Sequence, residues 1–198
     1  MLKADGTKFG KTAGGAVWLD PEKTSPYEFY QFWLNQNDAD VVKYLKYFTF
    51  LSKEEIDALE EKVATEPEKR EAQKTLAEEM TLFVHGEEGL KDAQTITEAL
   101  FSGNIADLSA KQIAQGFGNM PGSTMPKEAN NLAVWLVDAG IEASRRQSRE
   151  DITNGAIYVN GERIQDVDYE ISAADAIEGQ YIVVRRGKKK YFLVTIED

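Results

Sequence analysis

The hydrophobic residues of positions 25–119 recur at intervals of three and four, which is the spacing of one face of an α-helix. Several helix starts are marked within this stretch. Ser25 precedes a proline, an arrangement that is common at a helix N-terminus. Ser52, Thr65 and Ser109 each stand three residues before a glutamate or glutamine, which is the capping-box pattern. The stretch therefore predicts an all-helical unit of five or six helices.

Glycine interrupts the longest helical stretch. Phe83 lies at a position that places it on the apolar face of a helix expected to begin near Thr65. Gly86 is expected to end that helix, because glycine is the commonest residue just beyond a helix C-terminus. Another helix is predicted from about residue 89 to residue 101, before Gly103.

The pattern changes in the last part of the chain. Residues 119–130 are rich in glycine, proline and asparagine and have no periodicity, so they predict a linker. Two short helical stretches follow, closed by Gly140 and Gly155. Asn160 then precedes a glycine between two apolar stretches, which predicts a hairpin, and a second strand pair has its turn near Gly187.

These patterns predict an α+β multidomain chain. We expect a loop and connector at 1–20, an all-α helical domain at 21–118, the linker at 119–130, and a small α+β domain at 131–198 made of two helices and an antiparallel sheet. No apolar run approaches the roughly 18 residues of a membrane span, and no signal-peptide pattern opens the chain. We therefore expect a cytoplasmic protein with no membrane partner.

Charge and composition exclude several classes of site. The chain has 198 residues, no cysteine and a net charge of −11, so it has no disulfide or thiolate metal site and no overall basic surface. His85, the single histidine, stands at a predicted helix end, where a structural role is more common than catalysis. A Ser-His-Asp triad and a histidine metal centre both lack parts, and we expect no metal site.

Basic residues are nevertheless concentrated in two places within residues 130–198, a region with 9 basic and 12 acidic residues. Arg145 and Arg149 are one helical turn apart, and the N–H groups expected beyond Ser144 also favour phosphate. Such a surface suits RNA recognised by its backbone, whereas ion pairs with neighbours such as Glu150 are the alternative. The first basic cluster is Arg145, Arg146 and Arg149, and the second is Arg185, Arg186, Lys188, Lys189 and Lys190.

The segment "DGTKFGKTAGG" (residues 5–15) places two lysines among glycines. Gly10 and the two residues after it match the end of a nucleotide-binding P-loop. That pattern requires a glycine where the chain has Asp5, and the glycine comes one residue later. Lys8 and Lys11 would still suit phosphate oxygens, and the glycines would let the loop close on them. A disordered basic N-terminus is the alternative for so short a motif.

Three blocks of the sequence, taken together and in this order, resemble the C-terminal half of bacterial tyrosyl-tRNA synthetases. "KFGKT" (residues 8–12) is similar to the second signature motif of class I synthetases, usually written Lys-Met-Ser-Lys-Ser. "EKREAQKTLAEEMTLFVHGEEGL" (residues 68–90) resembles the helical region that follows it in this family. "SRRQSREDITNGAIYVNGERIQDV" (residues 144–167) resembles the S4-like RNA-binding fold that ends the bacterial members. The resemblance covers essentially the whole chain.

The resemblance implies a role for each matching residue. Lys8, Lys11 and Thr12 would belong to a mobile loop that stabilises the phosphates of ATP, with Mg²⁺ expected beside ATP, while the carboxylate of tyrosine attacks the α-phosphate. The helical domain would face the anticodon arm of tRNA(Tyr). The S4-like domain would bind the structured arms of the tRNA. Its expected RNA contacts are Arg145, Arg146, Arg149, Asn160, Arg185, Arg186, Lys188, Lys189 and Lys190.

In this family a Rossmann-type catalytic domain, with the tyrosine pocket and the dimer interface, precedes the first of these motifs. We therefore expect the chain to be a C-terminal fragment of a tyrosine–tRNA ligase that binds tRNA but forms no tyrosyl-adenylate and binds no ATP by itself. We expect the fragment to be a monomer and the parent enzyme a homodimer. The alternative is a stand-alone RNA-binding or intron-splicing adaptor derived from a synthetase.

Overall fold

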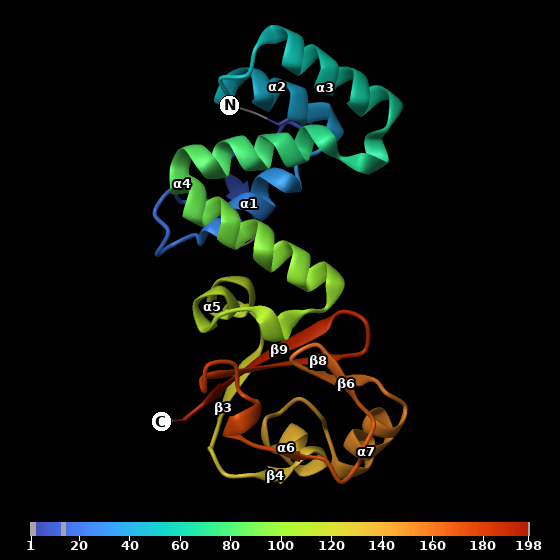
Figure 1. Cartoon of the computed structure of the whole chain (residues 1–198). Coiled ribbons are helices and arrows are strands. Elements are labelled where there is room, and N and C mark those ends of the chain that lie inside the picture. The colour runs from blue at the N-terminus through green and yellow to red at the C-terminus, as the bar shows by residue number, and fades with distance from the viewer. Residues whose placement is uncertain (1–2, 13–14, 198) are drawn as a thin grey trace. The chain divides into compact units, whose positions relative to one another are not determined.

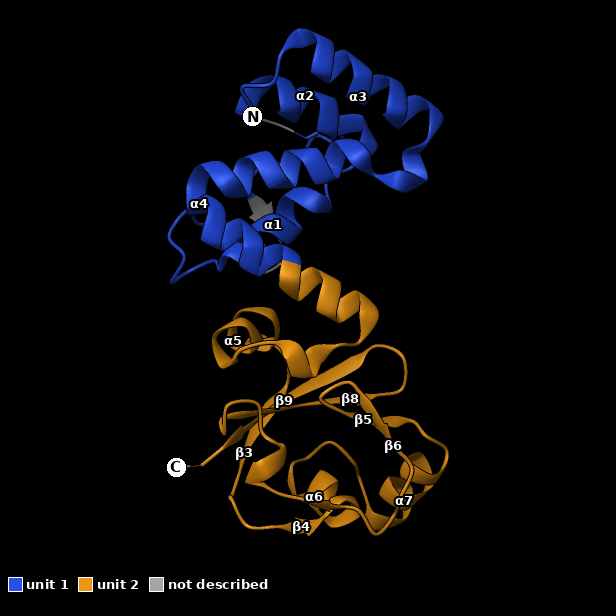
Figure 2. Cartoon of the chain, viewed as in Figure 1, with its two compact units in different colours: residues 1–94 blue, residues 95–198 orange. Residues whose placement is uncertain are grey.

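The computed structural model describes residues 3–12 and 15–197 of the chain. It divides into two compact units, unit 1 (residues 1–94) and unit 2 (residues 95–198), which Figure 2 shows in different colours. Unit 1 is helical apart from one short hairpin, and unit 2 combines helices with a mixed sheet (Figure 1). The α+β class predicted from the sequence is confirmed.

Unit 1 begins with a two-stranded antiparallel hairpin and continues as helices. The hairpin strands are β1 (Lys11–Thr12) and β2 (Gly15–Ala16). The helices are α1 (Pro26–Leu34), α2 (Asp38–Phe48), α3 (Lys53–Thr65), a 3₁₀ turn η1 (Pro67–Lys69), and α4 (Glu71–Ser102). Helix α4 continues past residue 94 into unit 2.

Side-chain caps fix the starts of α1 and α3. Ser25 and Ser52 each accept a hydrogen bond from the backbone N–H three residues later, at 3.2 Å in both cases, so these two predicted caps are confirmed. The predicted helix start at Thr65 is wrong. Thr65 is the last residue of α3, and its hydroxyl donates to Glu61 O at 2.9 Å. Arg70, with a φ of 52°, then turns the chain into α4.

Helix α4 changes direction at Gly86, which has a φ of 70° and a ψ of −175°. These angles are not helical, so the predicted break at this glycine is confirmed. Glycine suits the position because residues with a side chain rarely adopt that conformation. The buried positions of α4 advance in steps of four from Ala72 toward Val84. Phe83 lies beside this row and its side chain is 70% exposed, so the prediction that it shares the apolar face is wrong.

Unit 2 contains the end of α4, three further helices, two 3₁₀ turns and seven strands in its described part. The helical elements are η2 (Ile105–Asp107), α5 (Ala110–Phe117), α6 (Leu132–Asp138), α7 (Arg145–Thr153) and η3 (Ala173–Asp175). The strands are β3 (Gly122–Met125), β4 (Asn130–Asn131), β5 (Ile157–Val159), β6 (Glu162–Ile164), β7 (Glu170–Ile171), β8 (Tyr181–Arg186) and β9 (Lys190–Ile196). The main sheet has the order β3-β9-β8-β5-β6, and β4 pairs with β7.

Both predicted hairpins are confirmed. β5 pairs with β6 across Asn160 (φ 49°) and Gly161 (φ 91°), and β8 pairs with β9 across a turn that contains Gly187 (φ 64°). Positive φ angles explain why asparagine and glycine occupy these positions. A side chain at position 161 would place its Cβ 2.0 Å from Gly103 O, so this turn packs directly on the segment after α4.

The main sheet is mixed, which corrects the predicted antiparallel sheet. β3 pairs in parallel with β9, with Gly122 opposite Leu193 and Met125 opposite Ile196. β3 lies inside residues 119–130, so part of the predicted linker is a sheet strand. Its four residues are too few to show an alternating pattern, and their partner strand is the last one in the chain.

Helix α5, which the sequence analysis places in the helical domain, packs on the sheet of unit 2. The ring centroids of Phe117 and Tyr191 are 5.7 Å apart, and Glu178 accepts a hydrogen bond from Ala110 N at 3.0 Å. The apolar face of an amphipathic helix, as seen in the sequence, indicates that the helix packs against something, but it does not indicate which part of the chain that is. The compact units divide between residues 94 and 95, within α4, whereas the sequence pattern predicts a domain boundary after residue 118.

The sheet of unit 2 lies between α5 on one face and α6 with α7 on the other (Figure 1). The core on the α6 and α7 side includes Trp135, Leu136, Ile152, Ile157 and Val184, each no more than 2% exposed. This packing fixes α7 and the end of β8, the two places that carry the basic clusters. Among the described residues, no helix is long and apolar enough to cross a membrane.

Candidate functional site

The predicted phosphate loop, residues 8–12, is attached to α1 and α2. Lys8 is exposed, whereas the ring of Phe9 packs against the core of unit 1, with its centroid 4.9 Å from that of Tyr44. Gly10 has a φ of 80° and turns the chain into β1. The remaining predicted residues, Lys11 and Thr12, form β1, and the structure describes their backbone but not their side chains.

The residues before the loop also contact α2. Asp5 accepts hydrogen bonds from the hydroxyl and the N–H of Thr7, at 2.7 and 2.9 Å, and these bonds hold the pKa of the Asp5 carboxyl below its usual value. Ala4 N donates to Asp40 Oδ1 at 2.9 Å, and the same oxygen pairs with Lys43 Nζ at 3.1 Å. The side chain of Asp40 is only 2% exposed, so the segment is anchored to a buried group.

Helix α7 carries the first basic cluster. Its N-cap, Ser144, accepts a hydrogen bond from Gln147 N at 3.3 Å, which confirms the predicted cap. Arg145, Arg146 and Arg149 are all exposed. In the part of the chain that the structure describes, these three arginines form no ion pair with a carboxylate. The cluster can therefore offer its charge to an anionic ligand.

The members of the second basic cluster have different surroundings. The guanidinium of Arg185 lies 3.7 Å from the ring centroid of Tyr158. The Nε of Arg186 lies 2.8 Å from Asp151 Oδ2 and 2.9 Å from Glu142 Oε1. Arg186 thus ties the end of β8 to α7, a structural role that the sequence analysis does not include. Lys188, Lys189 and Lys190 are exposed at the β8–β9 turn.

The two carboxyl groups beside Arg186 differ in acidity. Burial raises the pKa of Glu142 to about 7, and the charge of Arg186 opposes this effect. Burial also acts to raise the pKa of Asp151, but hydrogen bonds from its neighbours outweigh burial and keep that pKa below its usual value. Arg186 is therefore paired with one firmly ionised carboxylate and one group that gains a proton near neutral pH.

Asn160, a predicted RNA contact, has its side chain engaged in the fold. Its amide nitrogen donates to Asp175 O at 2.6 Å, and its Oδ1 accepts from Val183 N at 2.8 Å. These bonds fix the β5–β6 turn against β8 and η3. Like Arg186, Asn160 contributes to the structure whatever its role toward RNA.

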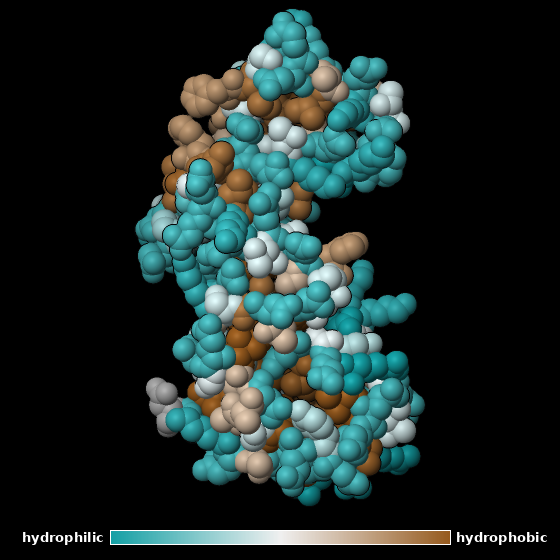
Figure 3. Space-filling view, in the orientation of Figure 1, coloured by the Kyte–Doolittle hydropathy of each residue, from teal (hydrophilic) through white to brown (hydrophobic). Residues whose placement is uncertain are grey.

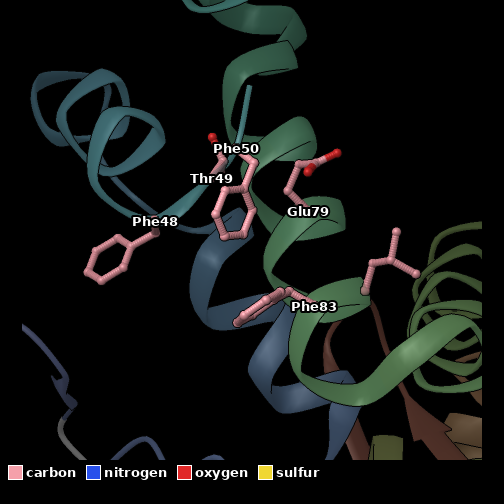
Figure 4. A pocket seen from close by; sticks show the side chains of 6 residues that line it. Phe48, Thr49, Phe50, Glu79 and Phe83 are labelled. Carbon is pink, nitrogen blue, oxygen red and sulfur yellow. The ribbon is translucent and has the colours of Figure 1, made fainter. Parts of the chain in front are cut away.

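Unit 1 exposes aromatic side chains that the sequence analysis does not single out as binding residues. Phe50 is 86% exposed and Phe83 70%, and their ring centroids lie 5.8 Å apart. Figure 3 shows hydrophobic residues gathered at one edge of this unit. The two rings line a surface depression together with Phe48, Thr49, Glu79 and Leu82 (Figure 4). Helical periodicity does not reveal it, because Phe50 follows the end of α2 and Phe83 lies beside the buried row of α4.

Among the described residues, the other titratable groups form no second candidate catalytic or metal site. The ring of His85 packs edge to face on Phe29, with centroids 4.9 Å apart, and burial lowers its pKa. Within residues 3–12 and 15–197, no group of three or more His, Asp or Glu side chains is placed to hold a metal ion. The candidate chemistry of the described chain is therefore the phosphate loop and the two basic clusters.

The first half of the sequence matches a known family. A family model described as "tRNA synthetases class I (W and Y)" matches residues 1–102, just over half of the chain. The chain belongs to the class I tRNA synthetases. A second model, described as "Tyrosine--tRNA ligase SYY-like C-terminal domain", matches residues 112–194 of this synthetase chain. The two matched regions follow each other in the order that the sequence analysis expects.

Individual tyrosine–tRNA ligases resemble this synthetase chain along its whole length. The ligase of Lactobacillus delbrueckii subsp. bulgaricus is 68% identical and that of Ligilactobacillus salivarius 66% identical, each over 197 residues. Each match covers 100% of this chain and 47% of the relative, so the chain spans about half the length of these relatives. A solution structure of a tyrosyl-tRNA synthetase C-terminal domain is 52% identical and covers 50% of this chain and 100% of that one, with a TM-score of 0.42. The predicted resemblance to the C-terminal half of tyrosyl-tRNA synthetases is confirmed.

Proposed function

We propose that the chain is the tRNA-binding C-terminal part of a tyrosine–tRNA ligase, which activates tyrosine with ATP and transfers it to tRNA(Tyr). The observation that carries the proposal is a phosphate motif at residues 8–12 joined to an α+β unit with two basic clusters, in a sequence 68% identical to such a ligase along its whole length. Because the chain spans about half of that relative, catalysis is proposed for the full-length protein and RNA binding for the chain itself.

The proposed RNA surface is formed by α7 and the β8–β9 turn of unit 2. The ion pair between Arg186 and Asp151 supports their proximity, because it ties the end of β8 to α7. Exposed basic residues of both elements can then neutralise phosphates, which supply much of the affinity for a nucleic-acid backbone. We propose that residues 131–198 form an S4-like RNA-binding domain in which the exposed members of both basic clusters contact the tRNA.

For unit 1 the proposed partner is the anticodon arm of tRNA(Tyr). The exposed rings of Phe50 and Phe83 support this assignment, because unpaired RNA bases stack on aromatic side chains. The full-length protein is proposed to be a cytoplasmic homodimer. The chain alone is proposed to be a monomer, for which light scattering should give a mass near 22.2 kDa at all concentrations.

Lys8, Lys11 and Thr12 are proposed to bind the phosphates of ATP in the full-length ligase. The carboxylate of tyrosine attacks the α-phosphorus, and the bond from that phosphorus to pyrophosphate breaks. Negative charge then grows on the pyrophosphate oxygens, and ammonium groups held beside them lower the barrier. Mg²⁺ is proposed to enter with ATP, because this ion binds phosphate oxygens and offsets their charge.

Fluorescence anisotropy with labelled tRNA(Tyr) tests the RNA-binding part of the proposal. Arg145→Ala with Arg149→Ala should weaken binding and make the slope of log affinity against log salt shallower by about 1.5–2, because two fewer phosphates are neutralised. Lys53→Ala with Lys69→Ala is a matched control, since it removes the same charge from exposed ion pairs of unit 1. The control should change neither quantity, and an unchanged slope in the arginine variant would refute the assignment of α7.

A further inference from the structure

Phe9 stands between the two lysines of the phosphate loop, and its ring points into unit 1. Lys8 is exposed, whereas Phe9 is partly buried against the core of that unit. Four aromatic side chains of α1 and α2, here called the aromatic seat, contact the ring. The centroid distances are 5.7 Å to Phe32, 5.5 Å to Trp33, 4.9 Å to Tyr44 and 5.4 Å to Phe48. One residue of the motif is thus held by the helices while its neighbour faces solvent.

The chain is attached to unit 1 on both sides of Phe9. Before it, Ala4 N donates to the buried carboxylate of Asp40 on α2 at 2.9 Å. After it, Val17 packs against the same core, and its N–H donates to Gly10 O at 3.2 Å, which closes the base of the β1–β2 hairpin. The hairpin that follows the loop is therefore fixed at its base, next to the ring of Phe9.

The ring of Phe9 is the side chain that packs the loop onto α1 and α2 between these attachments. Gly6 and Gly10, with φ values of 81° and 80°, turn the chain on either side of the segment, and an added Cβ at either position would touch nothing. Glycines of this kind leave a loop pliable. A ring packed among four others has few alternative positions, because interiors are close-packed and aromatic pairs prefer defined geometries. The place of Phe9 thus sets the place of the backbone from which Lys8 and Lys11 extend.

We propose that Phe9 is a positioning residue for tyrosine activation: its ring in the aromatic seat fixes where Lys8 and Lys11 meet the phosphates of ATP. The inference rests on the proposed function of the phosphate loop. It deepens that function because a phenyl ring carries no hydrogen-bond donor or positive charge for phosphate and can act only through the neighbouring groups of the loop. A residue with a merely structural role would affect every activity of the protein alike.

Tyrosine-dependent ATP–pyrophosphate exchange provides the test. The enzyme is the chain joined to the part of the Lactobacillus delbrueckii ligase that it does not match, here called the joined ligase. Lys8→Ala is measured first and should lower kcat. Phe9→Ala should lower kcat by about tenfold to a hundredfold, the effect of a displacement of about 1 Å in a reacting complex, and leave the KM for tyrosine unchanged. Phe9→Met, which fills the seat with an apolar side chain of similar volume, should stay within about threefold of the unsubstituted enzyme.

A double-mutant cycle separates positioning from simple stability. If Phe9 acts through the two lysines, adding Phe9→Ala to an enzyme that already carries Lys8→Ala and Lys11→Ala should slow exchange by less than about twofold beyond that lysine variant alone. Phe101→Ala is the matched control, because that ring is 95% exposed and lies outside unit 1, and it should leave exchange unchanged. Circular dichroism of each variant reports the folded fraction. If Phe9→Ala is unfolded, Phe9→Val replaces it, since valine keeps an apolar side chain but is too short to reach all four rings.

The outcomes are distinguishable. If Lys8→Ala leaves exchange unchanged, the proposed function of the loop fails, and the role of Phe9 fails with it. If Lys8→Ala lowers the kcat of exchange but Phe9→Ala does not, only the positioning role of Phe9 is overturned. It is also overturned if the two losses are additive, or if Phe9→Ala raises the KM for tyrosine as much as it lowers kcat.

Discussion

Replacing Arg186 with alanine removes the guanidinium that lies between Glu142 and Asp151 in unit 2. The side chain of Glu142 is 0% exposed, that of Asp151 16% and that of Arg186 31%. Breaking a buried ion pair by removing one partner costs about 3–5 kcal/mol, and the partial exposure of this guanidinium reduces the figure. We expect the free energy of unfolding of unit 2 to fall by about 2 kcal/mol at a pH of about 8.

The loss should be smaller in mild acid because of Glu142. Its pKa in the folded state, about 7, lies above the ordinary glutamate value of 4.5, so between these values the folded state retains a proton that the unfolded state has released. A protonated carboxyl is neutral and does not require the guanidinium. Near pH 5.5, roughly midway in that window, only Asp151 loses its charged partner, and we expect a loss of about 1 kcal/mol.

Urea unfolding followed by tryptophan fluorescence measures this loss. Trp18 and Trp33 belong to unit 1, and replacing both with phenylalanine leaves Trp135, in the core of unit 2, as the reporter. Arg146→Ala removes an exposed arginine from the same unit and should change stability by less than about 0.5 kcal/mol. For Arg186→Ala, a loss below about 0.5 kcal/mol at the higher pH, or an equal loss at both pH values, would refute the reasoning.

Three other substitutions test neighbouring features of unit 2. The raised pKa of Glu142 predicts that the unsubstituted protein loses stability as pH rises from 4.5 to about 7, and Glu142→Gln should abolish this loss. If the melting temperature of the variant still falls over that range, a different group is responsible. Gly161→Ala should cost about 2 kcal/mol or more, because its Cβ would lie 2.0 Å from Gly103 O at a positive φ; an unchanged urea midpoint would mean that this contact is absent in solution. Ser109→Ala should cost about 1 kcal/mol by removing the cap on Gln112 N, and hydrogen exchange in the first turn of α5 should quicken; equal exchange rates would count against the cap.

Features that depend on nearby residues could be predicted from the sequence. The caps at Ser25 and Ser52 and the turn at Asn160 each involve groups within a few positions of one another, so their chemistry is visible in a short window. The pairing of β3 with β9 could not be predicted, because a four-residue strand shows no period and its partner is distant in the chain. For the same reason the sequence does not show which sheet face α5 covers, or that the compact units divide within α4.

The residue types of the candidate site could be predicted, but their partners could not. In the sequence Arg186 is one of several neighbouring basic residues. Only the fold brings it to Asp151, which is 35 positions away. In the sequence Phe9 only stands where the Lys-Met-Ser-Lys-Ser motif has methionine. The fold is what gathers the rings of α1 and α2 around it. Side-chain type limits what chemistry a position can perform, whereas tertiary contacts decide whether a charge is available to a ligand or is used within the protein.

Steady-state tyrosylation of tRNA(Tyr) by the joined ligase tests most directly whether unit 2 serves a tyrosine–tRNA ligase as its tRNA-binding part. With Arg145→Ala and Arg149→Ala together, we predict that kcat/KM for tRNA(Tyr) falls at least about tenfold while ATP–pyrophosphate exchange keeps its rate. An enzyme that charges tRNA(Tyr) equally well without these arginines, or that loses exchange and charging together, would contradict this role.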